Sequence, residues 1–396
     1  MAVLKIVLKI FASLLLVALL AVIATSVSVV YHFLPPKPFS GKDIFNPYRN
    51  FSTTLPWKRA NFHTHTRVEG LLNECDYTPE QAIEYYDEFD YNIVTLSNHN
   101  ALTAHPTDTT HSNTLYEHGY NLFKFHKLVF GSGAVNRFDH LLPLFAFQKQ
   151  WQMDMLAATA DLVVLNHPYR THTITKRQME RLAGYDIVEL DSGKGTENEY
   201  WDWALSAGRY SFGIANDDLH HPERTNAIAV RCNFLCTPSE SYDDVCKTLS
   251  EGCYYAMRIP DYGAGDREVK IAKNRTIPYI KNIGTTNEAV FIALSECADS
   301  IKITGQDRAT LAVHYGTDSV GYRMRATDPY SRFTAYFAEG EVIYSNPFAR
   351  YDASVAPLPT VGDTHSRSIP LTVLYNLALA LLFVGVSTLF YKTIIW

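Results

Sequence analysis

The chain reads Asn61-Phe62-His63-Thr64-His65-Thr66, which puts two histidines two positions apart directly after an apolar residue. In an extended strand alternate side chains share a face, so His63 and His65 are expected to project to the same side. Imidazole is a common ligand of borderline transition metals, and two on one strand end can bind one ion. Two exposed histidines in a loop would give the same short pattern, so its meaning depends on the rest of the chain.

The segments that follow alternate between strand and helix patterns through about residue 258. Apolar, β-branched runs predict strands at 59–63, 91–97, 161–166, 187–190 and 211–215. Helices are predicted at 78–86, 175–183 and 197–207. This order predicts a parallel α/β barrel or a doubly wound sheet. From Asp266 the pattern changes to short alternating strands separated by turn residues, which indicates a small antiparallel β-sandwich.

Histidines recur at the ends of four of the predicted strands. His63 and His65 end the first, His99 follows the strand at 91–97, and His167 follows the strand at 161–166. Asp218 and His220 follow the strand at 211–215. In a parallel barrel the C-terminal strand ends converge on one face, so the joint pattern predicts a metal site there.

These motifs, in the order HxH, NH, Asn166-His167-Pro168 and Asp218-Leu219-His220, resemble the PHP family, the polymerase and histidinol phosphatase metallohydrolases. The carbaryl-hydrolase-like branch is the most similar, through segments like those at 201–210, 252–256 and 344–348. The resemblance covers about residues 59–350. It implies a distorted seven-stranded (βα) barrel at 59–260 and a β-sandwich at 266–355. It also implies two or three divalent ions (zinc, manganese or iron) and cleavage of phosphoesters.

The resemblance also implies roles for individual residues. The metal ligands would be His63, His65, Glu74, His99, His140, His167, Asp218 and His220. The catalytic residues would be Asp218, His167 and a substrate-facing Arg170, with Glu189 beside the barrel mouth.

Three positions depart from the family pattern. Asn61 and Asn98 stand where Asp is usual, and Gly133 stands where a Glu is expected that normally bridges two ions. Without that carboxylate, two like-charged cations lose the group that screens their repulsion, so the number of ions is left open between one and three.

Two ligand sets are then expected. His63, His65 and Asp218 would hold one ion, and Glu74, His99 and His220 would hold a second. His140 and His167 would form a weak third site or act as acid/base groups. By contrast, four further histidines are expected to be solvated: His105, His111, His118 and His126.

Both ends of the chain are apolar. The runs 10–34 and 369–391 contain no charged residue and are long enough to cross the hydrocarbon of a bilayer as helices. A cleaved signal peptide and a buried terminal helix are the alternatives, and the length of each run disfavours them. Lys5, Lys9 and Lys392 flank the two spans on their far sides, which predicts cytoplasmic termini, a linker at 35–58 and an extracytoplasmic central domain. Six cysteines there allow disulfides, whose pairing the sequence does not define.

A net charge of −6 does not indicate a basic surface that would bind nucleic acid. The sequence therefore favours a membrane-anchored hydrolase that uses a metal-activated water on a small-molecule or lipid-linked phosphoester. Two alternatives remain. One is a catalytically degenerate binding or interaction module at the membrane surface, and the other is an ester or carbamate hydrolase with the same chemistry.

Overall fold

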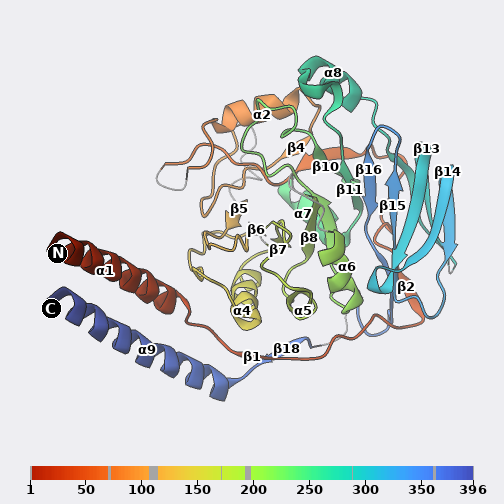
Figure 1. Cartoon of the computed structure of the whole chain (residues 1–396). Coiled ribbons are helices and arrows are strands. Elements are labelled where there is room, and N and C mark those ends of the chain that lie inside the picture. The colour runs from red at the N-terminus through yellow and green to blue at the C-terminus, as the bar shows by residue number, and fades with distance from the viewer. Residues whose placement is uncertain are drawn as a thin grey trace.

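The computed structural model describes residues 2–69, 73–106, 115–170, 172–191, 198–287, 289–359 and 363–395. They form a mixed α/β domain from which two long apolar helices extend side by side (Figure 1). The helices are α1 Ala2–Thr25, α2 Pro79–Asp87, α4 Ala146–Ala157, α5 Lys176–Met179, α6 Asn198–Ser206, α7 Tyr242–Glu251, α8 Arg267–Asn274 and α9 Ile369–Ile395.

The strands fall into an N-terminal and a C-terminal series. The first contains β1 Tyr31–Phe33, β2 Asp43–Phe45, β3 Lys58–Asn61, β4 Ile93–Val94, β5 Leu115–His118, β6 Lys127–Phe130, β7 Leu162–Leu165, β8 Ile187–Asp191, β9 Phe212–Ala215, β10 Arg231–Leu235 and β11 Tyr254–Arg258. The second contains β12 Ile280–Thr286, β13 Ala289–Gly305, β14 Thr310–Arg323, β15 Tyr330–Tyr336, β16 Val342–Ser345, β17 Phe348–Tyr351 and β18 His365–Arg367.

Within the described residues the strands pair into two main sheets. One runs in the order β5-β6-β7-β8-β9, and its last three strands are parallel. The other runs β12-β13-β15-β16-β11-β10-β3-β4, with β3 and β4 parallel and the rest of that path antiparallel. The sheets do not join into a closed ring of paired strands among these residues, so the predicted seven-stranded barrel is not confirmed.

Two isolated bridges connect the sheets where the metal site was predicted. His99, after β4, pairs with Glu117 of β5, and Thr64, after β3, pairs with Leu219, after β9. The second bridge is reinforced by the His65 N–H, which donates to the Leu219 carbonyl at 2.9 Å. The topology therefore brings four chain segments to one place although the ring is not closed.

Burial fixes the sheet of β5 to β9 against its helices. Met153 of α4 and Trp201 of α6 pack into the same buried cluster as Val129, Val163 and Val188 of the sheet. Full burial of an aliphatic or aromatic side chain contributes about 1.5–3 kcal/mol relative to leaving it exposed. Strands apolar on both faces, as in β7 Leu162–Leu165, are what a covered parallel sheet requires.

The strands after α8 differ from the expected separate sandwich. They are antiparallel, as predicted, but β16 pairs with β11 of the preceding region, so the long β13 and β14 continue one sheet that reaches β3. The separate sandwich is therefore not confirmed, and the domain boundary near residue 266 stays a prediction.

Interactions between residues close in the chain could be predicted from the sequence. Thr78 accepts a hydrogen bond from the Gln81 N–H while the Gln81 side chain accepts from the Thr78 N–H, and this capping box begins α2 where the helix at 78–86 was predicted. This helix matters to the site because Tyr86, near its end, donates to Asp217 at 2.9 Å.

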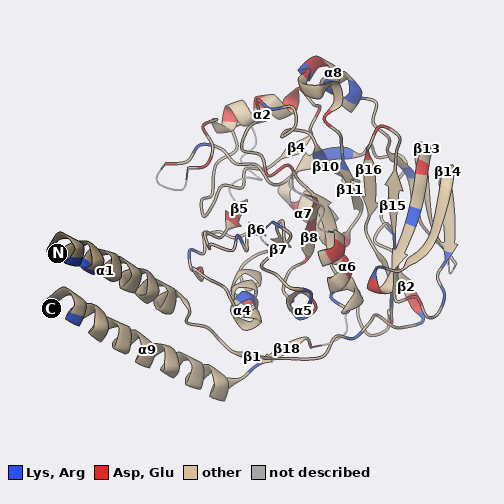
Figure 2. Ribbon diagram, viewed as in Figure 1, with Lys and Arg blue, Asp and Glu red and all other residues tan. Residues whose placement is uncertain are grey.

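The helices α1 and α9 are each long and apolar enough to cross a membrane, over Val3–Thr25 and Ile369–Ile394. Figure 2 shows their lysines at the ends farthest from the domain. Between helix and domain, β1 pairs antiparallel with β18, so both connecting segments enter the domain together.

Candidate metal centre

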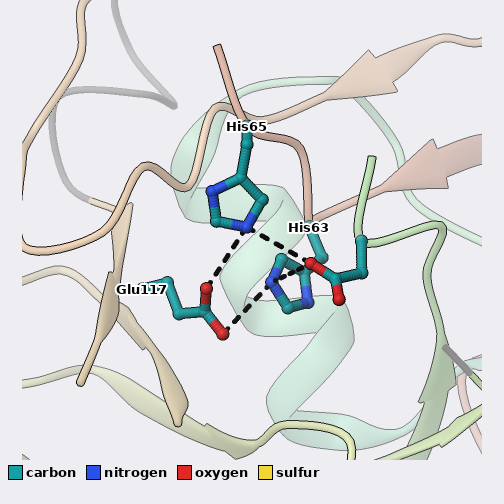
Figure 3. A group of neighbouring side chains, drawn as sticks. His63, His65 and Glu117 are labelled. Atoms are coloured by element: carbon teal, nitrogen blue, oxygen red, sulfur yellow. Dashed lines mark ion pairs between the residues drawn. The ribbon is translucent and has the colours of Figure 1, made fainter. Parts of the chain in front are cut away.

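Four side chains from three chain segments form the centre of the site. Nε2 of His63 lies 3.2 Å from Glu117 Oε1 and 3.2 Å from Asp218 Oδ1. Nε2 of His65 lies 3.2 Å from Glu117 Oε2 and 3.3 Å from Asp218 Oδ1. Figure 3 shows both imidazoles turned toward the Glu117 carboxylate. All four side chains are buried or nearly so.

The donor atoms of this group have the properties of metal ligands. Among the described residues, Nε2 of His63, Nε2 of His65 and Oδ1 of Asp218 are buried without a hydrogen-bond partner, and so is Oε2 of Glu117. One donor atom from each residue lies within 4.8 Å of the others. A tetrahedral ion with bonds of about 2.0 Å separates its ligands by about 3.3 Å, close to the spacings above. The donor set therefore fits a divalent transition metal.

Glu117 also belongs to a second group of potential ligands. Its Oε2 lies 3.1 Å from His99 Nε2, and its Oε1 lies 3.2 Å from His126 Nδ1. Beyond His99, Glu74 Oε2 lies 3.2 Å from His99 Nε2 and 3.3 Å from His220 Nε2. A carboxylate shared between two ligand groups is what a bridged pair of ions requires.

Neighbouring acceptors orient the imidazoles. The Nδ1–H of His63 donates to Glu189 Oε1 at 3.0 Å, which leaves the lone pair of Nε2 facing the group. Glu189 also accepts from the His167 N–H at 2.8 Å and from Asn216 at 3.1 Å. The Nδ1–H of His220 donates to the Asp218 carbonyl at 2.8 Å, which turns Nε2 toward Glu74. Glu189 therefore acts as a support of the ligands rather than as one of them.

Two of the site residues have a backbone conformation that side chains rarely adopt. His167 has φ 24° and Asp218 has φ 50°. Non-glycine residues with positive φ are uncommon, and they cluster at sites where the surroundings hold them in place. The strain is offset here by hydrogen bonds of the adjacent chain, including three backbone N–H groups that donate to Asp217.

Opposite charges in the site shift the pKa values of their neighbours. Burial alone would lower the pKa of His63, but Glu117, Asp218 and Glu189 raise it well above its ordinary value. Burial would raise the pKa of Glu117, yet His99, His63 and His126 hold it well below its usual range. Burial and His220 lower the pKa of His65. The carboxylates are thus kept ionised in a buried place, as cation ligands must be.

A cavity of about 410 Å³ opens beside the group. Its lining includes Glu74, Lys124, Arg170, Asp218, His220 and Arg231. Arg170 Nη1 lies 2.5 Å from Asp218 Oδ2. A larger cavity of about 650 Å³ lies near Trp57 and Arg59, and none of the histidines described above lines it.

The structure brings most of the predicted site residues together and leaves His140 apart from them. It brings together His63, His65, Glu74, His99, His167, Asp218 and His220, with Arg170 beside them. His140 has different neighbours: its Nδ1–H donates to the carbonyl of Thr25 at the end of α1, and its ring packs near Trp151.

The carboxylate at the centre of this group was not identified in the sequence analysis. Gly133 lies in the loop after β6, whereas the central carboxylate is Glu117 of β5, one strand earlier in the chain. The family resemblance places a glutamate at position 133, whereas Glu117 lies in Leu115-Tyr116-Glu117-His118, outside the motifs that carry the resemblance. A glutamate in a short apolar strand is the signal that could have found it.

Three of the histidines expected to be solvated are buried: His105, His118 and His126. Burial lowers the pKa of His126 to about 4, although Glu117 opposes the shift. Its position just before β6 puts it at the same edge of the sheet as Glu117. The fourth, His111, lies outside the described residues.

No family model matches this chain, and no curated protein matches it. Among solved structures it is similar to a two-domain protein from Bacteroides vulgatus that contains a predicted PHP-like metal-dependent phosphoesterase. The likeness has 12% sequence identity and a TM-score of 0.35, and it covers 80% of this chain and 100% of that one.

Proposed function

We propose that this protein is a membrane-anchored, metal-dependent hydrolase of the PHP type that cleaves phosphoesters. The observation that supports it most is the convergence of buried, otherwise unpaired donor atoms of His63, His65, Glu117 and Asp218. The order of the histidine motifs along the chain, which resembles that family, adds to this support.

Divalent ions held by these residues would supply an acidified water molecule and polarise a phosphoryl oxygen. The side chains around the site have tasks of their own. Arg170 holds Asp218 in place and puts a guanidinium in the cavity, where it would stabilise negative charge on a transferring phosphoryl group. His167, whose Nε2 lies 3.2 Å from Glu117 Oε1, is our candidate for proton transfer to the leaving oxygen.

The cavity lining favours a phosphoester over an uncharged ester or carbamate. Its wall contains Lys124, Arg170 and Arg231 beside the carboxylates Glu74, Asp217 and Asp218. Arg170 and Arg231 are ion-paired with Asp218 and Asp191, so Lys124 is the cation we assign to an anionic substrate. The alternative of a catalytically degenerate module rested on three missing carboxylates, at Asn61, Asn98 and Gly133. Glu117 lies 3.2 Å from His63 and 3.1 Å from His99, and this nearby carboxylate supports the hydrolase over that alternative.

Membrane anchoring by α1 and α9 belongs to the same proposal. Their length and apolar composition support it, as does the position of Lys5, Lys9 and Lys392 at the far ends. The spanning helices would hold the site at a membrane surface.

The test compares Asp218→Asn with Asp318→Asn in the purified full-length protein. Asp218→Asn keeps the size of the side chain and removes a ligand charge, so we expect less bound zinc, manganese or iron and a loss of at least about 100-fold in phosphoester hydrolysis. Asp318 is exposed on β14, and its variant should match wild type in both measurements.

Elemental analysis and a panel of activated phosphomonoesters and phosphodiesters are the measurements. A chelator should abolish wild-type activity, and added metal should restore it. If the metal-loaded wild type shows no more hydrolysis than Asp218→Asn across the panel, the hydrolase proposal is wrong.

A further inference from the structure

The end of α1 is bonded to a loop of the domain. The Leu141 N–H donates to the Thr25 hydroxyl at 3.2 Å, next to the hydrogen bond between His140 and the Thr25 carbonyl. The Gln148 side chain contacts the Ser26 carbonyl at 3.5 Å and the Tyr375 hydroxyl of α9 at 3.3 Å. The segment 140–148 therefore lies against the point where both long helices leave the domain.

The polar contacts of α9 indicate where its apolar span begins. Asn376 donates to the Ser28 carbonyl at 2.8 Å and accepts from the Ser28 N–H at 3.3 Å. Beyond Asn376, residues 377–395 rise about 28 Å at 1.5 Å per residue. The hydrocarbon of a bilayer is about 30 Å thick. If α9 spans it, the boundary of the hydrocarbon falls near Asn376 and Thr25.

Apolar side chains of the domain are exposed at this level. Leu122 is 67% exposed, Leu144 52% and Phe145 50%. The neighbouring Phe147 ring packs 5.0 Å from the ring of Tyr375 in α9. The Leu122 N–H donates to the Leu141 carbonyl at 3.1 Å, which ties the turn between β5 and β6 to this segment. We call Leu122, Leu144 and Phe145 the apolar rim, and Figure 1 shows α4, β5 and β6 on the side of the domain nearest α1.

The turn that carries Leu122 also reaches the candidate metal centre. Lys124, two residues further on, lines the cavity together with Arg170 and Asp218. The turn is held in place because Asp139 accepts from the N–H groups of Tyr120 at 2.9 Å and Asn121 at 3.0 Å. One short, fixed turn thus carries an exposed apolar residue beside the segment 140–148 and a cation in the wall of the cavity.

We propose that the apolar rim enters the interface of the bilayer that α1 and α9 cross, and that the substrate is a phosphoester lipid of that bilayer. This rests on the proposed function. Lys124 would meet the phosphate as the headgroup enters the cavity. Hydrolysis would break the bond between phosphorus and the lipid alcohol oxygen. The oxygen of water would be added to phosphorus and a proton to the alcohol, which stays in the membrane.

Membrane contact can be measured without any activity. Full-length Leu122→Trp is reconstituted in phosphatidylcholine vesicles with brominated acyl chains, and the quenching of its fluorescence is measured. The quenching measured on wild type, which comes from the native tryptophans, is subtracted from that of the variant. Tyr315→Trp is the matched control, because Tyr315 is 78% exposed on β14, on the far side of the domain in Figure 1. We expect bromine to quench the fluorescence of the tryptophan introduced at position 122. The fluorescence of the tryptophan introduced at position 315 should stay unchanged. Equal quenching at the two positions would refute contact of the rim with the bilayer.

The substrate class is tested with phosphatidic acid and phosphatidylglycerol in phosphatidylcholine vesicles, against glycerol 3-phosphate in solution. We expect wild type to prefer a vesicle substrate. Leu122→Asp with Phe145→Asp should lower the ratio of vesicle to soluble hydrolysis about tenfold, because charge is placed where apolar area was buried. Val313→Asp with Tyr315→Asp should leave the ratio unchanged.

The outcomes separate the two proposals. Hydrolysis of glycerol 3-phosphate without hydrolysis of either lipid would reject the lipid substrate and keep the hydrolase. If the metal-loaded protein hydrolyses none of these three substrates, the lipid substrate is rejected. If it also hydrolyses nothing in the phosphoester panel above, the hydrolase proposal is rejected as well. The quenching result would still decide whether the rim contacts the bilayer.

Discussion

At the scale of single residues, Glu117 has more partners in the site than any other carboxylate described above. Its two oxygens lie near five imidazoles, those of His63, His65, His99, His126 and His167. It is 1% exposed, so its charge is not balanced by solvent. A buried carboxylate needs positive charge beside it, and metal ions held by Glu117 and these imidazoles would supply it.

Glu117→Gln should therefore lower metal content more than the loss of one peripheral ligand. The amide keeps the shape but removes the charge that a pair of ions would share, so we expect metal stoichiometry to fall by at least about half and hydrolysis by more than about 100-fold. Elemental analysis of the full-length protein, with circular dichroism to check the fold, is the measurement.

The metal content of His140→Ala is the comparison for that of Glu117→Gln. Because His140 bonds Thr25 at the end of α1, this variant should keep wild-type metal content. Loss of metal in His140→Ala, with metal retained in Glu117→Gln, would contradict the assignment of the centre.

At the scale of elements, the pairing of β10 and β11 places two cysteines opposite one another. The register pairs Leu235 with Tyr254, and the Cys236 N–H donates to the Cys253 carbonyl at 3.0 Å. A hydrogen bond from the Cys253 thiol lowers the pKa of Cys236 to about 7. Directly opposed residues of an antiparallel pair have Cα atoms about 4.5–5.5 Å apart, which falls in the range that a disulfide requires.

In an oxidising compartment we expect Cys236 and Cys253 to form a disulfide that encloses α7. A closed loop of about 15 residues contributes about 3 kcal/mol in the chain-entropy description. Peptide mapping of protein purified without reductant should recover the two cysteines as one linked peptide pair, and Cys236→Ser with Cys253→Ser should lower the melting temperature. Recovery of both as free thiols from an extracytoplasmic domain would contradict this prediction.

The sequence was informative where structure depends on neighbours in the chain. The capping box at Thr78 and the strand at Leu162–Leu165 follow from local chemistry. His63 and His65 both face Glu117, although β3 ends at Asn61, before either of them. Two features depend on contacts between distant segments and could not be read in this way. Glu117 meets His63 only through the bridges between the two sheets, and β16 joins β11 only through a register that no local pattern specifies.

At the scale of the whole molecule, the orientation of the domain is open to a direct measurement. Cys297 is the one exposed cysteine of the six, all of which lie in described residues. If residues 35–368 are extracytoplasmic, a membrane-impermeant maleimide added to intact cells should label the protein, and Cys297→Ser should lose most of that labelling. Labelling that appears only after the membrane is opened would reverse the orientation.

The pairing of β1 with β18 limits how far the domain can move. Only residues 26–30 separate α1 from β1, and Ser368 alone separates β18 from α9. Both segments are also fastened to one residue of α4, because Asp154 accepts from Tyr31 at 2.6 Å and lies 3.3 Å from His365. Five residues span at most about 18 Å when fully extended.

If α1 and α9 cross a membrane, a domain held this closely would serve only that membrane. Molecules in an apposed membrane would lie beyond its reach. It would meet its substrate by lateral diffusion in two dimensions, so its turnover would follow the surface density of that lipid rather than a bulk concentration.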